Sequence, residues 1–286
     1  MNAQVILTPT ESKKLMAKAI LEMESVREAL AHGIVVIHPS SSTYFIKESL
    51  IGPSNEGIWL IGMIVPRGAC VEAKTQQAFE EDRYQELTDP GNFPFSWVFK
   101  KGKPQKGLKL LDVLDALGRD DVYIKGVNAF DSHGYVGVLM ASLAGGTIGR
   151  ALAAQKKKGF QIVYVAGLEK FIPVSVKVVA KETGKNKTSD GFGIPCSLLP
   201  IKANPITEME AFKALTNVAA IPIASGGVGG AEGCTMMVLK GEKAEVKRAM
   251  ELVKGLKGAQ LPKVEFPDCA ACHFPGCFFS GKQIDW

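Results

Sequence analysis

The sequence predicts an α/β protein with a doubly wound, mostly parallel, Rossmann-like sheet, followed by a second, small ferredoxin-like α+β domain. Apolar strand-like runs alternate with helical periodicity between residues 34 and 166, which is typical of a doubly wound sheet. A stretch rich in Gly, Lys, Ser and Asn at residues 183–193 separates this part from a second unit, which has its own series of strand-like and helical segments. We therefore predict a Rossmann-like ligand-binding domain at residues 1–193, a ferredoxin-like domain at 194–266 and a cysteine-rich C-terminal tail at 267–286.

The first predicted domain begins with a helix, because apolar residues recur at helical spacing from Leu15 until Gly33 ends the run. The strand at 34–37 is apolar throughout, as expected for a strand that is buried on both faces. Residues 75–107 have the least regular pattern and contain a predicted hairpin arm at 93–99. The other predicted elements are a helix carrying Phe45, Ile46 and Leu50, a strand at 57–65, a helix at 108–117, strands at 121–125 and 136–140, a helix at 145–158 and a strand at 161–166.

The second predicted domain has the order strand, helix, strand, strand, helix, strand. This order is that of the split βαβ or ferredoxin-like arrangement. The strand-like segments are residues 194–201, 221–224, 235–239 and 262–266, and the helical segments are 207–218 and 243–254.

Composition excludes several classes of protein. Of 286 residues, 46% are hydrophobic, so the chain can build a core and global disorder is excluded. The net charge of +5 comes from 34 Lys and Arg against 29 Asp and Glu, an excess too small to indicate nucleic acid or membrane binding. We expect no membrane span, since no apolar run approaches ~20 residues, and no signal peptide, since the N-terminal stretch is charged. In the cytoplasmic location that this indicates, the six cysteines serve as thiols or metal ligands rather than disulfides.

A polar turn follows the strand at 34–37 and precedes a helix. It consists of Ser40, Ser41, Ser42 and Thr43. Its hydroxyls and the first free N–H groups of the helix should point to the carboxyl edge of the sheet, where the helix dipole also favours an anion. The alternative is a helix cap within a solvated turn, since Ser and Thr are favoured there in any case.

A second turn of this kind opens the helix at 145–158. Gly145 and Gly146 would let a ligand approach the backbone, and Thr147 would cap the helix. The alternative is that the glycines only permit close packing of helix and sheet. Because two such turns in one sheet can converge on one crevice, we predict that both turns bind the same anionic ligand.

Three segments resemble the ribose-5-phosphate isomerase-like proteins. Residues 12–50, including the turn at 40–43, resemble the opening helix and Gly-Ser-Thr phosphate loop of that superfamily. Residues 121–131 with Gly134 resemble its shared "Gly-Ala-Asp…Asp…Gly" segment. Residues 146–166 resemble the segment that follows in the sugar-phosphate isomerases related to initiation factor 2B.

The wider superfamily also contains coenzyme A transferases and the effector domains of sugar-sensing regulators. The resemblance extends from residue 12 to about residue 170, and the second predicted domain resembles the lid of ribose-5-phosphate isomerase. It implies a Rossmann-like fold, a small anionic ligand of the sugar phosphate or coenzyme A thioester type, and a homodimer.

The resemblance also identifies candidate catalytic residues. Asn128 stands where the superfamily pattern has its first acid, and an amide cannot act as a general base because it does not change protonation near neutral pH. Asp131 is the remaining candidate acid or base, with Lys125 as its electrostatic partner and His133 nearby in sequence. In the alternative interpretation, Asp131 and His133 only shape a turn and Lys125 is a solvated strand end.

Cys269, Cys272 and Cys277 form the densest chemical signal in the chain. A Cys-x-x-Cys turn places two thiolates on one metal, and a third thiolate can return after Pro275 and Gly276. Soft ligands suit zinc, or an iron–sulfur cluster as the second choice. The fourth ligand could be water or one of His273, Cys70, Cys196 and Cys234. The alternatives are an exposed thiol pair, a redox pair, or a c-type haem attachment, which would require export.

Two functions of different classes follow from the sequence. The first is an isomerase or transferase that binds a small anionic metabolite and acts through Asp131 and Lys125. The second is a non-catalytic ligand sensor or metal-stabilised scaffold that has kept the ligand site and lost the catalytic acids, as Asn128 indicates.

Overall fold

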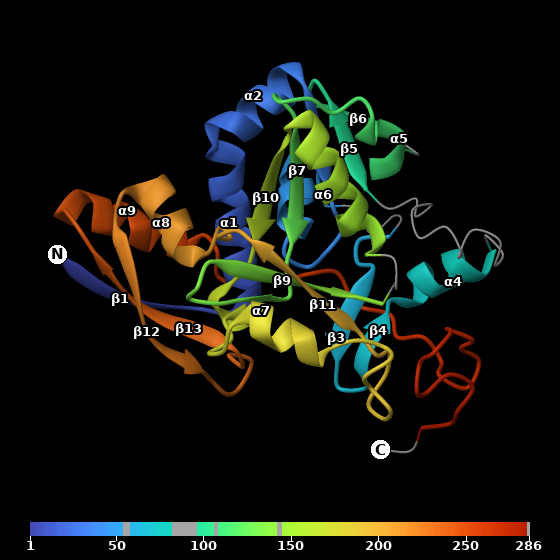
Figure 1. Ribbon diagram of the computed structural model, residues 1–286. Coiled ribbons are helices and arrows are strands. Elements are labelled where there is room, and N and C mark those ends of the chain that lie inside the picture. Colours follow the sequence, from blue (N-terminus) through green and yellow to red (C-terminus); the bar gives the residue numbers. More distant parts are fainter. Residues whose placement is uncertain (54–57, 82–95, 106–107, 142–144, 285–286) are drawn as a thin grey trace.

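The computed structural model describes residues 1–53, 58–81, 96–105, 108–141 and 145–284. These residues form a mixed α/β structure with several sheets (Figure 1). Residue 57 and the predicted hairpin residues 93–95 lie outside the described part. None of the helices described is long and apolar enough to cross a bilayer. The helices are α1 (Pro9–Glu22), α2 (Glu24–His32), α3 (Tyr44–Ile51), α4 (Ala73–Glu81), α5 (Leu110–Leu114), α6 (Gly146–Lys158), α7 (Val176–Val179), α8 (Glu208–Thr216) and α9 (Lys243–Lys254), with 3-10 turns η1 (Leu168–Lys170) and η2 (Ala180–Glu182).

The largest sheet is mixed and has the strand order β10-β7-β2-β5-β6. Its strands are β2 (Ile34–Ile37), β5 (Trp97–Lys100), β6 (Lys103–Gln105), β7 (Val122–Gly126) and β10 (Gln161–Val165). The strands β10, β7 and β2 are parallel, whereas β5 and β6 are antiparallel additions at the β2 edge. The predicted parallel part of the sheet is therefore three strands wide.

Both faces of this sheet are covered, which explains why β2 is apolar throughout. Val35 and Ile37 point into one core with residues of α1, α2 and α3, and Val36 points into a second core with residues of α5 and α6. The helix α1 begins with a capping box formed by Thr8 and Glu11, and its first residue is Pro9.

The second sheet differs from the predicted ferredoxin-like order. It consists of β1 (Asn2–Leu7), β13 (Cys234–Lys240) and β12 (Ala219–Gly226) in that order, all antiparallel, with α8 and α9 packed on one face. The N-terminal strand β1 thus pairs along its whole length with a strand more than two hundred residues away. Residues 262–266 form no strand. Local periodicity could not reveal β1, because only Val5 and Leu7 in it are buried.

A third sheet contains β8 (Ala129–Phe130), β9 (Tyr135–Met140) and β11 (Ser197–Lys202). The strand β11 was predicted to begin the second domain, but it pairs antiparallel with β9 instead. The reason lies in its packing, since Leu198 of β11 shares a small core with Ala129 and Val176. The predicted boundary at residue 193 therefore does not separate the sheets, and one apolar core joins α1 to α8 and α9.

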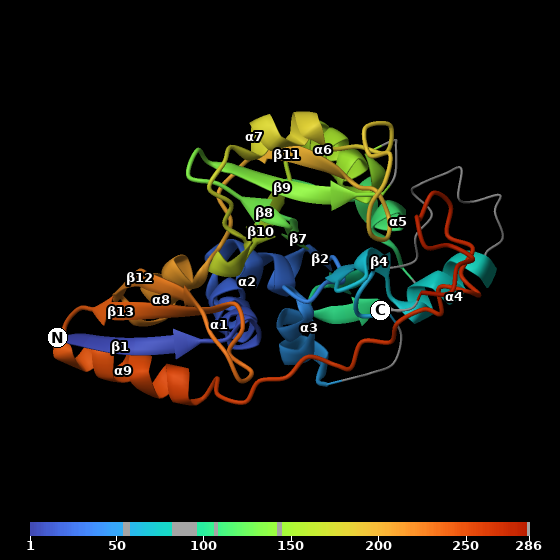
Figure 2. The same ribbon diagram turned by 90° about the horizontal axis from the view of Figure 1, so that it is seen from below.

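The C-terminal tail crosses the molecule and returns to the first half of the chain. Figure 2 shows it leaving α9 and running to the region of α4 and the hairpin of β3 (Gly62–Val65) and β4 (Gly68–Val71). The backbone N–H of Ala73 donates to the carbonyl oxygen of Glu265 at 3.0 Å, which fastens the tail beside α4.

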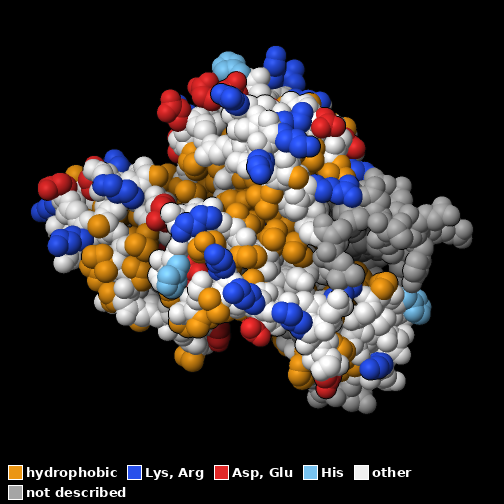
Figure 3. Space-filling view, in the orientation of Figure 1, with side chains coloured by type: hydrophobic (Ala, Val, Ile, Leu, Met, Phe, Trp, Pro, Cys, Tyr) orange, Lys and Arg blue, Asp and Glu red, His pale blue; other side chains and the backbone are white. Residues whose placement is uncertain are grey.

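The outer face of the small sheet is exposed. Figure 3 shows an apolar band over β12, where Ile221 and Ile223 are exposed, and lysine and arginine side chains across the middle of the same view. Because α8 and α9 cover the opposite face, this band faces away from the core.

Candidate active-site cavity

A cavity of about 860 Å³ opens at the carboxyl ends of β2 and β7, within the size range of small-molecule sites. Ser40, Ser41 and Ser42 line it from the turn after β2, and Gly145, Gly146 and Thr147 line it from the start of α6. The two predicted turns, far apart in sequence, therefore face the same space.

The serine turn contains two backbone N–H groups that are not used within the turn. The carbonyl oxygen of Ser40 accepts from the amides of Thr43 and Tyr44, at 3.1 and 3.0 Å, and closes the turn. The amides of Ser41 and Ser42 have no acceptor among the described residues. Such N–H groups at the end of a strand and the start of a helix are suited to bind an anion.

Thr43 has a structural role in the turn. Its side chain is buried, does not line the cavity, and donates a 2.5 Å hydrogen bond to the carbonyl oxygen of His38. Gly126, at the end of β7, leaves room for the turn, because a Cβ atom there would lie 2.7 Å from Oγ of Ser40.

The second turn differs in detail from its prediction. Gly145 is the N-cap of α6 and has a φ of 80°, a left-handed conformation that favours glycine. Thr147 lies within the first turn of α6 and is not its cap. The start of this helix therefore faces the cavity through glycine backbone, as the sequence indicated.

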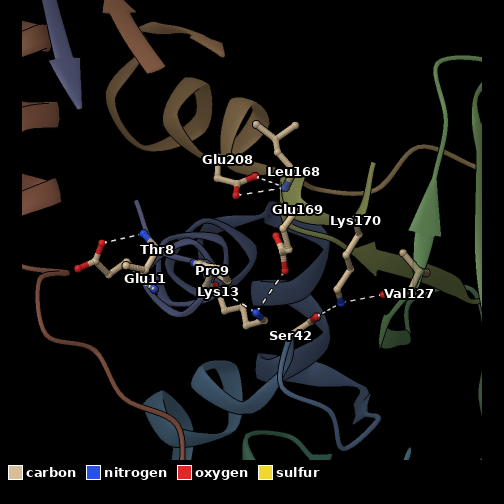
Figure 4. Close-up of polar contacts among 10 residues, drawn as sticks. All are labelled: Thr8, Pro9, Glu11, Lys13, Ser42, Val127, Leu168, Glu169, Lys170 and Glu208. Atoms are coloured by element: carbon tan, nitrogen blue, oxygen red, sulfur yellow. Dashed lines mark hydrogen bonds and ion pairs between the residues drawn. The ribbon is translucent and has the colours of Figure 1, made fainter. Parts of the chain in front are cut away.

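The buried Lys125 and the partly buried Lys170 lie at the polar end of the cavity. Nζ of Lys170 donates to Oγ of Ser42 at 2.7 Å and to the carbonyl oxygen of Val127 at 2.8 Å (Figure 4). Nζ of Lys125, which also lines the cavity, has no acceptor among the described residues. The predicted Lys125 is thus not a solvated strand end, and its ammonium group is left for a ligand.

The environment lowers the pKa of both lysines. Burial, and secondarily the charge of Lys170, lowers the pKa of Lys125 to about 7. Burial lowers the pKa of Lys170 to about 8, although Glu169 and Glu208 partly oppose this effect. Both groups therefore gain free energy from an anion that restores their charged forms.

Lys170 is held in place by the residues before it in η1. Glu169 forms a 3.2 Å ion pair with Lys13 of α1, and the amide of Leu168 donates at 2.9 Å to the carboxylate of Glu208 at the start of α8 (Figure 4). The contacts of η1 with α1 and α8 thus fix the position of Lys170, one of the two cavity lysines.

Glu208 makes the contact between η1 and α8 sensitive to pH. Burial raises the pKa of its carboxyl group to about 7, while hydrogen bonds from Ser12 and backbone amides oppose the rise. An acid with a raised folded-state pKa contributes stability at low pH that is lost as pH rises from 4.5 to about 7. We expect Glu208→Gln, which stays neutral and still offers a carbonyl oxygen to Leu168, to remove about 2–3 kcal/mol of this pH dependence.

Urea unfolding between pH 4.5 and 8 measures this change, and Glu251→Gln on the exposed face of α9 is the matched control. An unfolding free energy of Glu208→Gln that follows the parent protein at every pH would contradict the interpretation.

His38 adds a neutral polar group to the cavity wall. Burial, and secondarily the charge of Lys125, lowers the pKa of His38 well below its usual value. Its Nδ1 shares a 3.2 Å hydrogen bond with the hydroxyl of Tyr123, which fixes the ring. At neutral pH this imidazole is uncharged and can donate or accept one hydrogen bond to a ligand.

The rest of the cavity wall is apolar and lacks acids. No Asp or Glu lines the cavity in the described part of the chain, whereas Lys125, Lys170 and Lys185 do. The apolar wall includes Trp59, Leu60, Met63, Ile64, Val138 and Leu139. The cavity thus joins a cationic end to an apolar body.

Asp131 lies elsewhere. Its carboxylate accepts hydrogen bonds from the amides of His133, Tyr135 and Val176, at 2.8, 3.0 and 2.7 Å, and it does not line the cavity. Burial raises the pKa of Asp131, but these three hydrogen bonds outweigh burial and the net pKa lies below the usual value. This geometry favours the structural interpretation of Asp131, and His133 belongs to the same turn.

Asn128 lines the cavity, but its side-chain oxygen and backbone N–H are hydrogen-bonded to β9. Its side-chain Oδ1 accepts from the amide of Leu139 at 3.0 Å, and its backbone N–H donates to Gly137 at 2.8 Å. The amide therefore braces the cavity wall and offers no proton-transfer group.

The tail cysteines lie beside the cavity. Cys269, Cys272 and Cys277 form no disulfide and lie near Cys70 of β4, and Cys70, His273, Phe274 and Pro275 line the cavity. Burial raises the pKa of Cys70 to about 11, and the nearby thiols of the tail add to the rise. As the side chains stand, no group of three or more His, Cys, Asp or Glu in the described ranges is arranged to hold a metal ion.

Sequence reasoning missed Lys170 and His38. His38 directly follows β2 at the carboxyl edge of the sheet, whereas Lys170 ends η1, the first helical turn after β10. The strand-end position is the signal that could have identified His38.

Comparison of the chain with protein-family models, with curated proteins and with solved structures found no match. Fold and site together define a mixed α/β protein with a cationic, largely apolar cavity at the carboxyl edge of its main sheet.

Proposed function

We propose that this protein binds a small anionic metabolite in the cavity. The observation that carries the proposal is that Lys125 and Lys170 lie beside the serine turn, whose Ser41 and Ser42 amides have no described acceptor, in a cavity whose described lining has no acid. Burying an ammonium group, as at Lys125, costs free energy unless an opposite charge compensates it. A phosphate or carboxylate at this end of the cavity supplies that charge.

The apolar wall favours one of the two ligand types that the sequence suggested. A sugar phosphate would place hydroxyl groups against Trp59, Leu60 and Met63, where few partners for them exist. A coenzyme A thioester combines phosphates with an apolar acyl and pantetheine body, and it matches both parts of the cavity. We therefore favour a ligand of the coenzyme A thioester type.

Ser41 offers a direct test, because it lines the cavity and its side chain makes no hydrogen bond to a described residue. We expect Ser41→Asp to weaken binding of acetyl-coenzyme A by about tenfold, since a carboxylate there repels the phosphates. The neutral variant Ser41→Asn, of nearly the same size, should stay within about twofold of the parent. Isothermal titration calorimetry with acetyl-coenzyme A, and with ribose 5-phosphate as the competing ligand type, measures both effects.

Equal weakening by Asp and Asn would indicate a steric effect and contradict the proposed charge recognition. Absence of binding of either compound to the folded parent protein would remove the proposal.

A non-catalytic sensor is better supported than an isomerase of the kind that the sequence resemblance implied. The carboxylate of Asp131 is engaged by three amides away from the cavity, and Asn128 cannot exchange a proton. One observation favours catalysis: an amine with a pKa of about 7, as at Lys125, is partly neutral at physiological pH and can act as a base or nucleophile. Exchange of hydrogen between a bound ligand and solvent distinguishes the two, because a sensor gives none.

A further inference from the structure

The backbone brings Cys70 close to the last tail cysteine. Ala69, which precedes Cys70 in β4, forms a bridge with Gly193, and its carbonyl oxygen accepts from the amide of Ile194 at 2.8 Å. The carbonyl oxygen of Gly193 in turn accepts from the amide of Phe278 at 3.0 Å. Cys70 and Cys277 are therefore each next in sequence to a residue that is hydrogen-bonded to the segment 193–194.

The other two tail cysteines are held at the same place. The guanidinium of Arg67, in the turn between β3 and β4, donates to the carbonyl oxygen of Pro267 at 3.3 Å and contacts Sγ of Cys269 at 3.7 Å. The amide of Gly281 donates to the carbonyl oxygens of Cys269 and Cys272, both at 2.9 Å, and closes the turn. The thiols of all three tail cysteines lie near enough to Cys70 to interact with it electrostatically.

We propose that Cys70, Cys269, Cys272 and Cys277 form a four-thiolate site for Zn²⁺. Zinc prefers tetrahedral thiolate coordination, and a Cys-x-x-Cys turn joined to thiols from elsewhere in the chain is its usual protein setting. Because the sulfur atoms do not yet surround a common point, ion binding draws them together by side-chain rotation within segments whose backbones already meet.

The surroundings suit the charge of such a site. Four thiolates and one Zn²⁺ leave two negative charges, and Arg67 lies against Cys269 while Nζ of Lys185 lies 3.6 Å from a Cβ built on Gly276. The amide of Phe274 also donates to Sγ of Cys272 at 3.4 Å. Donors of this kind orient metal-bound sulfur and stabilise its charge.

The remaining cysteines fit the site less well. The thiol of Cys196 donates to the carbonyl oxygen of Ile194 at 3.3 Å, and Cys234 is buried in β13 of the small sheet. Cys196 is half-buried and lines the cavity, as Cys70 does, so it provides the matched control.

Titration of the metal-free, reduced full chain with Co²⁺ tests the proposal, because the sulfur-to-cobalt absorption grows with the number of cobalt–sulfur bonds. We expect one Co²⁺ per chain, displaced by Zn²⁺. In Cys70→Ser the absorption should fall by about a quarter and the affinity by about tenfold or more, whereas Cys196→Ser should match the parent. Cys70→His, which supplies a nitrogen ligand, should recover the affinity but not the lost absorption.

Circular dichroism verifies that each variant is folded, and Cys277→Ser should show the same loss of a quarter if Cys70→Ser does not fold. Parent-like absorption in folded Cys70→Ser, or a loss in Cys196→Ser instead, would overturn the assignment of Cys70. No Co²⁺ binding by the folded parent would overturn the site, and an iron–sulfur spectrum from anaerobically purified protein would overturn the choice of zinc.

Discussion

Replacement of Asp131 by alanine is expected to lower the free energy of unfolding by about 4 kcal/mol. The carboxylate is 1% exposed and accepts hydrogen bonds from the amides of His133, Tyr135 and Val176. Alanine leaves these three donors without a partner, and each hydrogen bond to a charged acceptor is worth about 1.5–3 kcal/mol. Val176 is the first residue of α7, whose N-cap Ser175 makes no side-chain cap, so the start of that helix also loses its compensating charge.

The asparagine variant refines this expectation. Both His133 and Tyr135 donate to Oδ1, which asparagine keeps, but Val176 donates to Oδ2, which becomes an N–H donor in asparagine. Asp131→Asn should therefore lose about half as much stability as Asp131→Ala.

Chemical denaturation at pH 7 measures both variants, and Asp120→Ala, at an exposed aspartate, should stay within about 0.5 kcal/mol of the parent. If Asp131→Ala unfolds like the parent but loses ligand binding, the carboxylate acts on the ligand and the catalytic interpretation from the sequence is restored.

Much of the site could be predicted from local sequence. The apolar run of β2, the serine turn after it and the glycines at the start of α6 are each local features of the sequence, and parallel strands bring their carboxyl ends to one edge of the sheet. The strand pattern together with the residue types of the two turns therefore predicted that both turns face one cavity. Lys125 was a candidate through the family resemblance, as a partner of Asp131, and the structure places it near the end of β7 in the cavity lining.

What could not be predicted depends on long-range pairing. Local pattern does not determine that β1 pairs with β13 or that β11 pairs with β9, because the sequence of a single strand does not specify which distant strand it joins. The sequence could not decide between a catalytic and a structural role for Asp131 for a similar reason. Its third hydrogen bond comes from Val176, which is 45 residues away. Lys170 was missed because the pairing of η1 with α1 and α8 fixes its position.

The second large effect concerns the two cavity lysines. Burial lowers the pKa of Lys125 to about 7, with a further contribution from Lys170, and lowers the pKa of Lys170 to about 8. A bound anion favours their charged forms, which prevail below these pKa values and are lost above them. Affinity for acetyl-coenzyme A should therefore fall by about a hundredfold between pH 6.5 and pH 9.

Lys125→Met separates the two groups, because methionine keeps the apolar stem and removes the charge. We expect about thirtyfold weaker binding at pH 6.5, the value of one charge-assisted hydrogen bond, and a pH dependence that begins near pH 8 instead of pH 7. Lys157→Met, on the exposed part of α6, changes the net charge equally and should keep the profile of the parent. Calorimetric titrations at several pH values measure both. Binding by Lys125→Met within twofold of the parent would mean that the buried amine does not face the anion, and the serine turn alone would then have to account for recognition.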